Sequence, residues 1–202
     1  MNSLAASCST TSVVSYLIEH GATPNLGPAI GPGIGSISAR KTVLTSGKVL
    51  HAAVRSNTAE MVDFLLSKGA KLSNATILHE AVYSKRIEMV QHVLNIPGVD
   101  INELDRVQTM GANCIGTPVL RAILVKSADL VKLLLENGAD ITIQGRTMHG
   151  VPVNALGLID SDNFSSEFKV LVENAVKTRQ SEGFGIGMER LGSWLSRALT
   201  LD

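Results

Sequence analysis

A chain of 202 residues with an apolar fraction of 45% is long enough to bury a continuous core, in one or two ordinary domains or in one elongated array. Its formal net charge is zero, and its basic residues are scattered. A protein that binds nucleic acid through phosphates needs a basic face, so we expect no nucleic-acid partner. No apolar run approaches the ~18 residues that a membrane-spanning helix needs.

The two cysteines and the N-terminus bear on the compartment. Cys8 and Cys114 lie far apart and form no metal or redox spacing, so reduced thiols are expected. The first residues lack the basic start and apolar core of a signal peptide. We therefore expect an intracellular, cytoplasmic protein.

The first 47 residues hold a partial structural unit and an insertion. Residues 1–25 are predicted to contain the tail of one helix at Ser3–Ser7 and a second helix at Val13–His20. Residues 26–47 begin with a stretch too rich in glycine and proline for a helix or a strand interior. The glycines at 31, 33 and 35 resemble a nucleotide-binding loop. That fingerprint needs its third glycine one residue later than position 35, a strand before the glycines and a helix after them, and none of these is present. A mobile loop is therefore the better interpretation.

One amphipathic helix recurs along the chain. In its clearest copy, Ala128–Asp140, Leu130, Val131, Leu134 and Leu135 form one apolar stripe, and a glycine follows the stripe. Glycine ends many helices because it adopts a positive φ without strain. Related copies occupy Val13–Ala22, Glu60–Ala70 and Glu88–Asp100. Four copies of one helix and one stop signal predict a repeat protein.

A short opener precedes the later copies. It reads Val49–Ala53, Thr76–Ala81 and Thr117–Ala122 in successive units. With these segments the chain resembles the ankyrin-repeat family, whose units open Thr-Pro-Leu-His-x-Ala and continue through two antiparallel helices and a β-turn. The marker positions Leu50, Leu78, Val119 and Val153 are spaced by 28, 41 and 34 residues. These spacings scatter around the family period of about 33.

The resemblance implies an all-α fold, a short ankyrin-like solenoid of stacked helix-turn-helix units over residues 1–175. The expected divisions are a partial unit at 1–25, the insertion at 26–47, units at 48–74, 75–114 and 115–147, a degenerate unit at 148–175, a linker at 176–187 and an amphipathic helix at 188–202. The last helix would cap the apolar end of the array, since terminal units need a polar outer face. Docking into a partner's groove and lying on a membrane surface are the alternatives.

Histidines and carboxylates that recur in the units suggest chemistry at first sight. His51 and His79 could act as bases or metal ligands, but no nucleophile or carboxylate recurs beside them. The resemblance instead implies that each histidine bonds the backbone of an adjacent turn. Glu60, Glu88 and Asp129 begin the second helices, where they complement the helix dipole. We expect no catalytic, cofactor or metal site, and so no enzyme.

The remaining candidate site is a surface. The family usually binds partners on the concave side of the stack, which first helices and hairpin tips line. The resemblance places eight residues there: Arg55, Asn57, Glu80, Tyr83, Lys85, Arg86, Arg121 and Lys126. Arginine and tyrosine are typical interface anchors, although any solvated helix face carries such residues. The expected function is a non-catalytic protein–protein interaction module. The alternative is a regulatory or targeting fragment of a larger multidomain enzyme or signalling protein.

Overall fold

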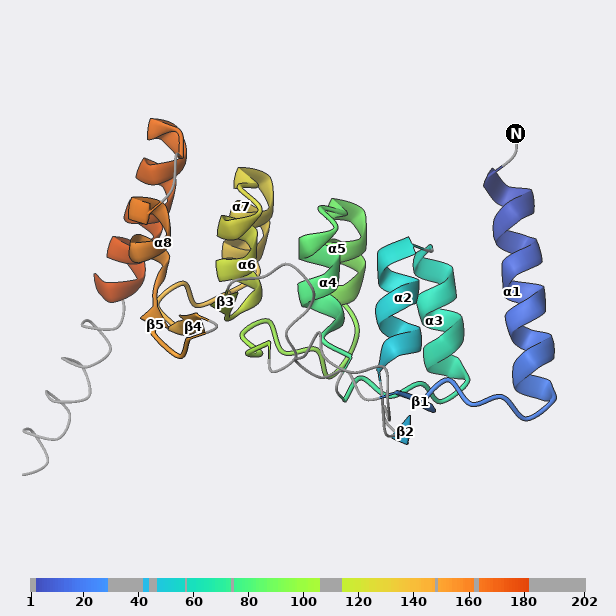
Figure 1. The fold of residues 1–202 in the computed structure, drawn as a ribbon. Coiled ribbons are helices and arrows are strands. Elements are labelled where there is room, and N and C mark those ends of the chain that lie inside the picture. Colours follow the sequence, from blue (N-terminus) through green and yellow to red (C-terminus); the bar gives the residue numbers. More distant parts are fainter. Residues whose placement is uncertain are drawn as a thin grey trace, which may run out of the picture.

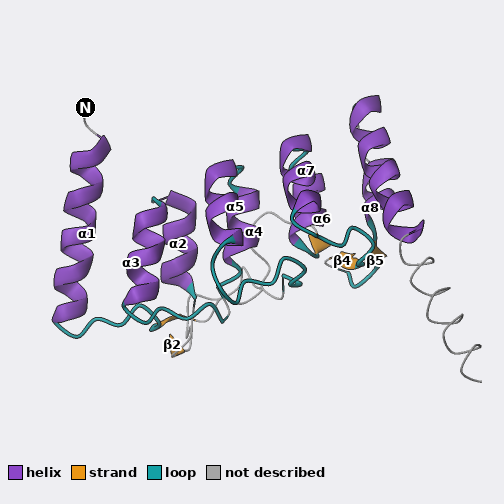
Figure 2. Ribbon diagram, turned by 180° about the vertical axis from the view of Figure 1, so that it is seen from behind, coloured by secondary structure: helices purple, strands orange, loops and turns teal. Residues whose placement is uncertain are grey.

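The computed structural model describes residues 3–28, 42–43, 47–56, 58–73, 75–105, 114–147, 149–161 and 164–181. Helices stand side by side in a row, mostly as antiparallel pairs, and the loops that join successive units run along the lower edge of the row (Figures 1 and 2). The expected all-α ankyrin-like solenoid is thereby confirmed. None of the described helices has both the length and the hydropathy needed to cross a bilayer.

Each unit pairs a first helix with a second helix, and the described turns from α4 to α5 and from α6 to α7 are tight. The first helices are α2 (Lys48–Ser56), α4 (Ile77–Tyr83), α6 (Pro118–Leu124) and α8 (Ala155–Ser161); the second helices are α3 (Ala59–Ser67), α5 (Ile87–Leu94), α7 (Ala128–Glu136) and the helix at residues 166–181. Each first helix also packs on the first helix of the next unit, from α2 through α4 and α6 to α8. We call the surface of these helices and of the turns that follow them the first-helix face.

The core follows from the apolar stripes. On α3, α5 and α7 the stripe buries two adjacent residues and a third one turn later, such as Leu130, Val131 and Leu134 on α7. On the first helices the marker positions Leu50, Leu78 and Val119 are buried. A glycine with a positive φ follows each of these second helices, with φ of 85° at Gly69, 90° at Gly98 and 90° at Gly138. They are the stop signals that the sequence predicts.

Short antiparallel strands join the loops at the base of the stack. Strand β1 (Gly27–Pro28) pairs with β2 (Thr42–Val43). Strands β3 (Cys114–Ile115), β4 (Gly145–Thr147) and β5 (Pro152–Val153) form a sheet in that order, with Ile115 opposite Arg146 and Gly145 opposite Val153. The sheet ties the loops before α6 and α8 to each other.

The N-terminal unit differs from the prediction. Residues Ser3–Glu19 form one continuous helix, α1, instead of a helix tail followed by a separate helix. No glycine or proline lies within this stretch, so nothing in it forces a turn. Val14 and Ile18 of α1 pack toward the core, whereas Val13, Tyr16 and Leu17 stay exposed. A largely apolar cavity of ≈ 420 Å³ lies where Val14 of α1 faces α2 and α3.

The C-terminal boundary also differs. Residues 176–181 are helical, so they are not part of a linker. The helix that begins at residue 166 continues because its stripe of Phe168, Val172 and Val176 stays buried and no glycine or proline interrupts it. Residues 182–187, the capping helix expected at 188–202 and most of the insertion at 26–47 lie outside the described residues.

Candidate functional site

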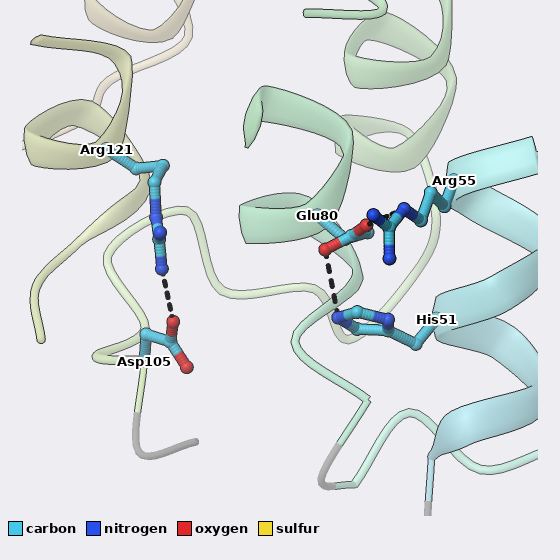
Figure 3. A network of polar contacts seen from close by, with 5 residues as sticks. All are labelled: His51, Arg55, Glu80, Asp105 and Arg121. Atoms are coloured by element: carbon cyan, nitrogen blue, oxygen red, sulfur yellow. Dashed lines mark hydrogen bonds and ion pairs between the residues drawn. The ribbon is translucent and has the colours of Figure 1, made fainter. Parts of the chain in front are cut away.

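A buried carboxylate joins the first two complete units. Glu80 on α4 is only 2% exposed, and its Oε2 lies 3.0 Å from Nε2 of His51. Its Oε1 lies 3.5 Å from Nε of Arg55, whose side chain is 61% exposed. Figure 3 shows Glu80 pointing across to these two residues of α2. A buried carboxylate is costly unless it is paired, so this contact holds α4 against α2.

A second buried ion pair holds a loop. Arg121 on α6 donates from Nη2 to Oδ2 of Asp105 at 2.6 Å, and the two residues are 4% and 1% exposed (Figure 3). The Arg121 guanidinium also lies 5.7 Å from the ring centroid of Tyr83 on α4. Asp105 stands in the loop between α5 and β3, and its backbone N–H donates to the Gly116 carbonyl at 3.0 Å. Arg121 thus connects this loop to the first helices.

His79 holds the segment between β3 and α6, to which the Asp105 backbone is bonded. Its Nε2 lies 2.9 Å from the Gly116 carbonyl oxygen, so Nε2 carries the proton and donates. Burial disfavours the imidazolium and lowers the pKa of His79, against the attraction of the nearby Asp105 carboxylate. The expectation that this histidine bonds the backbone of an adjacent turn is met. His51 differs, because its Nε2 faces the Glu80 carboxylate.

Arg86 has a structural role as well. Its Nη1 donates to the Val54 carbonyl at 2.6 Å, near the C-terminal end of α2. The last carbonyls of a helix lack partners within the helix, and a cationic donor there also complements the dipole. Arg86 therefore bridges the first two complete units from the side opposite the loops.

The structure divides the eight predicted interface residues. Glu80 and Arg121 are buried in ion pairs, so the expectation that they face a partner is wrong. Arg86 donates to a backbone carbonyl, a structural role that the sequence did not predict. Tyr83 is half-buried beside Arg121. Asn57 lies outside the described residues. The residues with exposed side chains are Arg55, Lys85 and Lys126.

The two lysines share an unusual backbone. Lys85 and Lys126 occupy equivalent turns between first and second helices, and their φ angles are 54° and 55°. This left-handed conformation costs a residue other than glycine about 1–2 kcal/mol. Lys126 also places Nζ 4.9 Å from the ring centroid of Phe164 in the next unit. Both lysines stand seven residues after a marker position, but this spacing does not predict the positive φ, because Asp160 stands seven residues after Val153 and lies within α8.

The second helices carry a different kind of contact. His92 on α5 lies 2.9 Å from the Asp63 carboxylate on α3, but Asp63 is 57% exposed. Exposed pairs of this type contribute little to stability. Across the described part of the chain, no three histidine, cysteine, aspartate or glutamate side chains are grouped so that they could hold a metal ion.

Comparison with known proteins supports the repeat assignment. Residues 33–105 match a family model described as ankyrin repeats (3 copies). Among solved structures, the ankyrin repeat domain of Bcl-3, described as a unique member of the IkappaB protein family, superposes with a TM-score of 0.52 at 22% sequence identity. The match covers 83% of this chain and 64% of that one, so this chain aligns with less than two thirds of that structure. No curated protein matches the chain.

Proposed function

Because this chain is an ankyrin-repeat protein, and such repeats are generally protein–protein interaction modules, we propose that it binds a protein partner through its first-helix face. The observation that carries the proposal is the pair of exposed lysines at strained turns, Lys85 and Lys126. Glycine would occupy these positions without strain. Backbone strain that persists at two equivalent sites is typical of residues whose side chains have a function.

The packing beneath this face favours binding. Glu80 and Arg86 hold α4 and the turn after it against α2 through contacts of 2.6 to 3.5 Å, and Arg121 on α6 holds the Asp105 loop at 2.6 Å. A surface that is already ordered loses less conformational entropy when a partner docks. The three buried or bonded residues thus support the interface from below, and the side chains of Arg55, Lys85 and Lys126 are exposed on this face.

A non-catalytic role fits the state of the titratable groups. His79, Glu80 and Asp105 are engaged with other protein groups and are 1%, 2% and 1% exposed. A general base must reach a substrate proton directly or through one water, and these groups are buried in the stack. The alternative is a regulatory or targeting fragment of a larger multidomain enzyme or signalling protein. A cytoplasmic location belongs to this proposal.

A display experiment tests the binding face. Random peptides are selected on the immobilised chain and then measured against two variants. Arg55→Ala/Lys126→Ala changes the first-helix face, and Lys132→Ala/Glu136→Ala changes the exposed side of α7. We expect the first variant to lose about tenfold in affinity, equivalent to about 1.4 kcal/mol, and the second to bind like the unmodified chain. Peptides that bind both variants equally would place the interface elsewhere.

A further inference from the structure

We infer that the partner segment is acidic, rich in aspartate and glutamate, and lies across the turns of the first-helix face from α2 to α6. The inference rests on the proposed function and specifies the chemistry of its partner. The whole chain is neutral, so its net charge says nothing about the partner. The inference comes from how charge is distributed between the two layers of helices.

Charge is segregated by layer. In the first helices and following turns of the three complete units, residues 48–56, 77–86 and 118–127, six of the seven charged residues are basic. In the second helices α3, α5 and α7, five of the six charged residues are acidic. A net charge of zero therefore hides a basic face and an acidic face. Complementary potentials of this kind steer a partner of opposite sign toward one side of a protein.

The acidic groups near the basic face are buried beneath it in ion pairs. Glu80, the single acid in those three segments, is 2% exposed and faces His51 and Arg55. Asp105 is 1% exposed and paired with Arg121. Neither carboxylate is presented to a partner, whereas Arg55, Lys85 and Lys126 are exposed. Arg86 bonds a neutral carbonyl, which leaves its positive charge uncompensated by that contact.

The basic row ends at the fourth unit. Asp160 lies in the last turn of α8, the first helix of the fourth unit. Asp160 is exposed. An acidic segment would meet repulsion there, so the predicted contact covers three units. Asp160→Lys should extend the row and strengthen binding.

Phosphates could also meet this row, but nucleic acid is the less favoured ligand. The positive charges stand one or two to a unit, and the acidic second helices lie directly behind them. A duplex or a long single strand needs a continuous basic surface and would approach the acidic side as well.

The test uses fluorescence anisotropy with three labelled probes on the whole chain. They are a Glu/Ala-rich peptide, its Lys/Ala counterpart and a single-stranded oligonucleotide with the same number of charges as the acidic peptide. We expect the acidic peptide to bind and to weaken at least ~10-fold as salt rises from 0.01 M toward about 0.15 M, over which the Debye length falls from about 30 to about 8 Å. Equal or tighter binding of the oligonucleotide would overturn the inference.

Variants assign the binding to the strained turns. Lys85→Gly/Lys126→Gly removes two charges and also relieves the positive φ, so its Tm should rise while its affinity for the acidic peptide falls at least ~10-fold. The matched control, Lys68→Ala/Lys132→Ala, removes two exposed charges next to or within the second helices and should leave affinity unchanged. Unchanged affinity in the glycine variant would overturn the inference. If display-selected neutral peptides bind the first-helix face while the acidic peptide does not, the proposed function stands and the acidic partner is wrong.

Discussion

The two layers of this stack bury different chemistry. The second helices α3, α5 and α7 bury apolar side chains alone. The first helices α4 and α6 bury His79, Glu80 and Arg121 among theirs. Apolar burial is non-directional and tolerates any neighbour with the same stripe. Buried ions accept only specific partners, so we expect the first-helix layer to determine which unit follows which and where the segments before α6 are held.

The largest expected effect comes from breaking a buried pair in the first-helix layer. Asp105→Ala leaves the Arg121 guanidinium, 4% exposed, without its carboxylate. Removing one partner of a buried pair costs about 3–5 kcal/mol. Urea unfolding monitored by circular dichroism would measure the loss. The control Asp63→Ala breaks an exposed pair with His92 and should cost less than about 1 kcal/mol. Equal losses would remove the distinction between the layers.

Leu134→Ala, which leaves a cavity in the second-helix layer, should lower the free energy of unfolding slightly less than Asp105→Ala does, and by an amount that does not depend on pH. Leu134 on α7 is fully buried at 0% exposure, and Leu→Ala changes at such sites cost about 2–5 kcal/mol. Because no ionisable group is removed, the loss should be the same at pH 5.5 and pH 7.5. Unfolding curves at the two pH values provide the test. A loss that changes with pH would mean that the apolar layer is coupled to the buried charges.

Acid should weaken the first-helix layer through His79. Burial lowers the pKa of His79, so the unfolded chain binds the proton more readily than the folded chain does. Its contribution to stability is complete above the unfolded pKa of about 6.5 and is lost as pH falls below that value. A single group can change stability by at most about 1.4 kcal/mol per pH unit. His79→Gln should flatten the stability profile between pH 7 and pH 5, and an unchanged slope would show that another group causes it.

The smallest expected effect is a gain. Lys85→Gly should raise stability by about 1 kcal/mol, because glycine adopts the φ of 54° without the strain that lysine bears. The gain is reduced by the greater backbone freedom of glycine in the unfolded chain. Lys132→Gly, inside the exposed side of α7, should instead lose about 1 kcal/mol. Thermal unfolding of both variants should therefore give shifts of opposite sign, and two losses would contradict the strain argument.

The sequence by itself determined the architecture and left the surface uncertain. The apolar stripe of Leu130, Val131 and Leu134, and the glycine stops after each second helix, depend on residues within one or two turns. Local periodicity of this kind is legible without a structure. The same reasoning explains the two boundary errors, at α1 and at residues 176–181. In both places the expected break had no glycine or proline to cause it.

Only the tertiary structure decided which polar residues face outward. Arg121 pairs with an aspartate 16 positions away in a loop, and Arg86 bonds a carbonyl 32 positions away. Glu80 turns toward α2, a helix of the preceding unit. Such partners come together only when neighbouring units stack, so spacing along one helix carries no signal of them. Lys85 and Lys126 are exposed at the turns between first and second helices, and Lys126 reaches the Phe164 ring of the next unit from there.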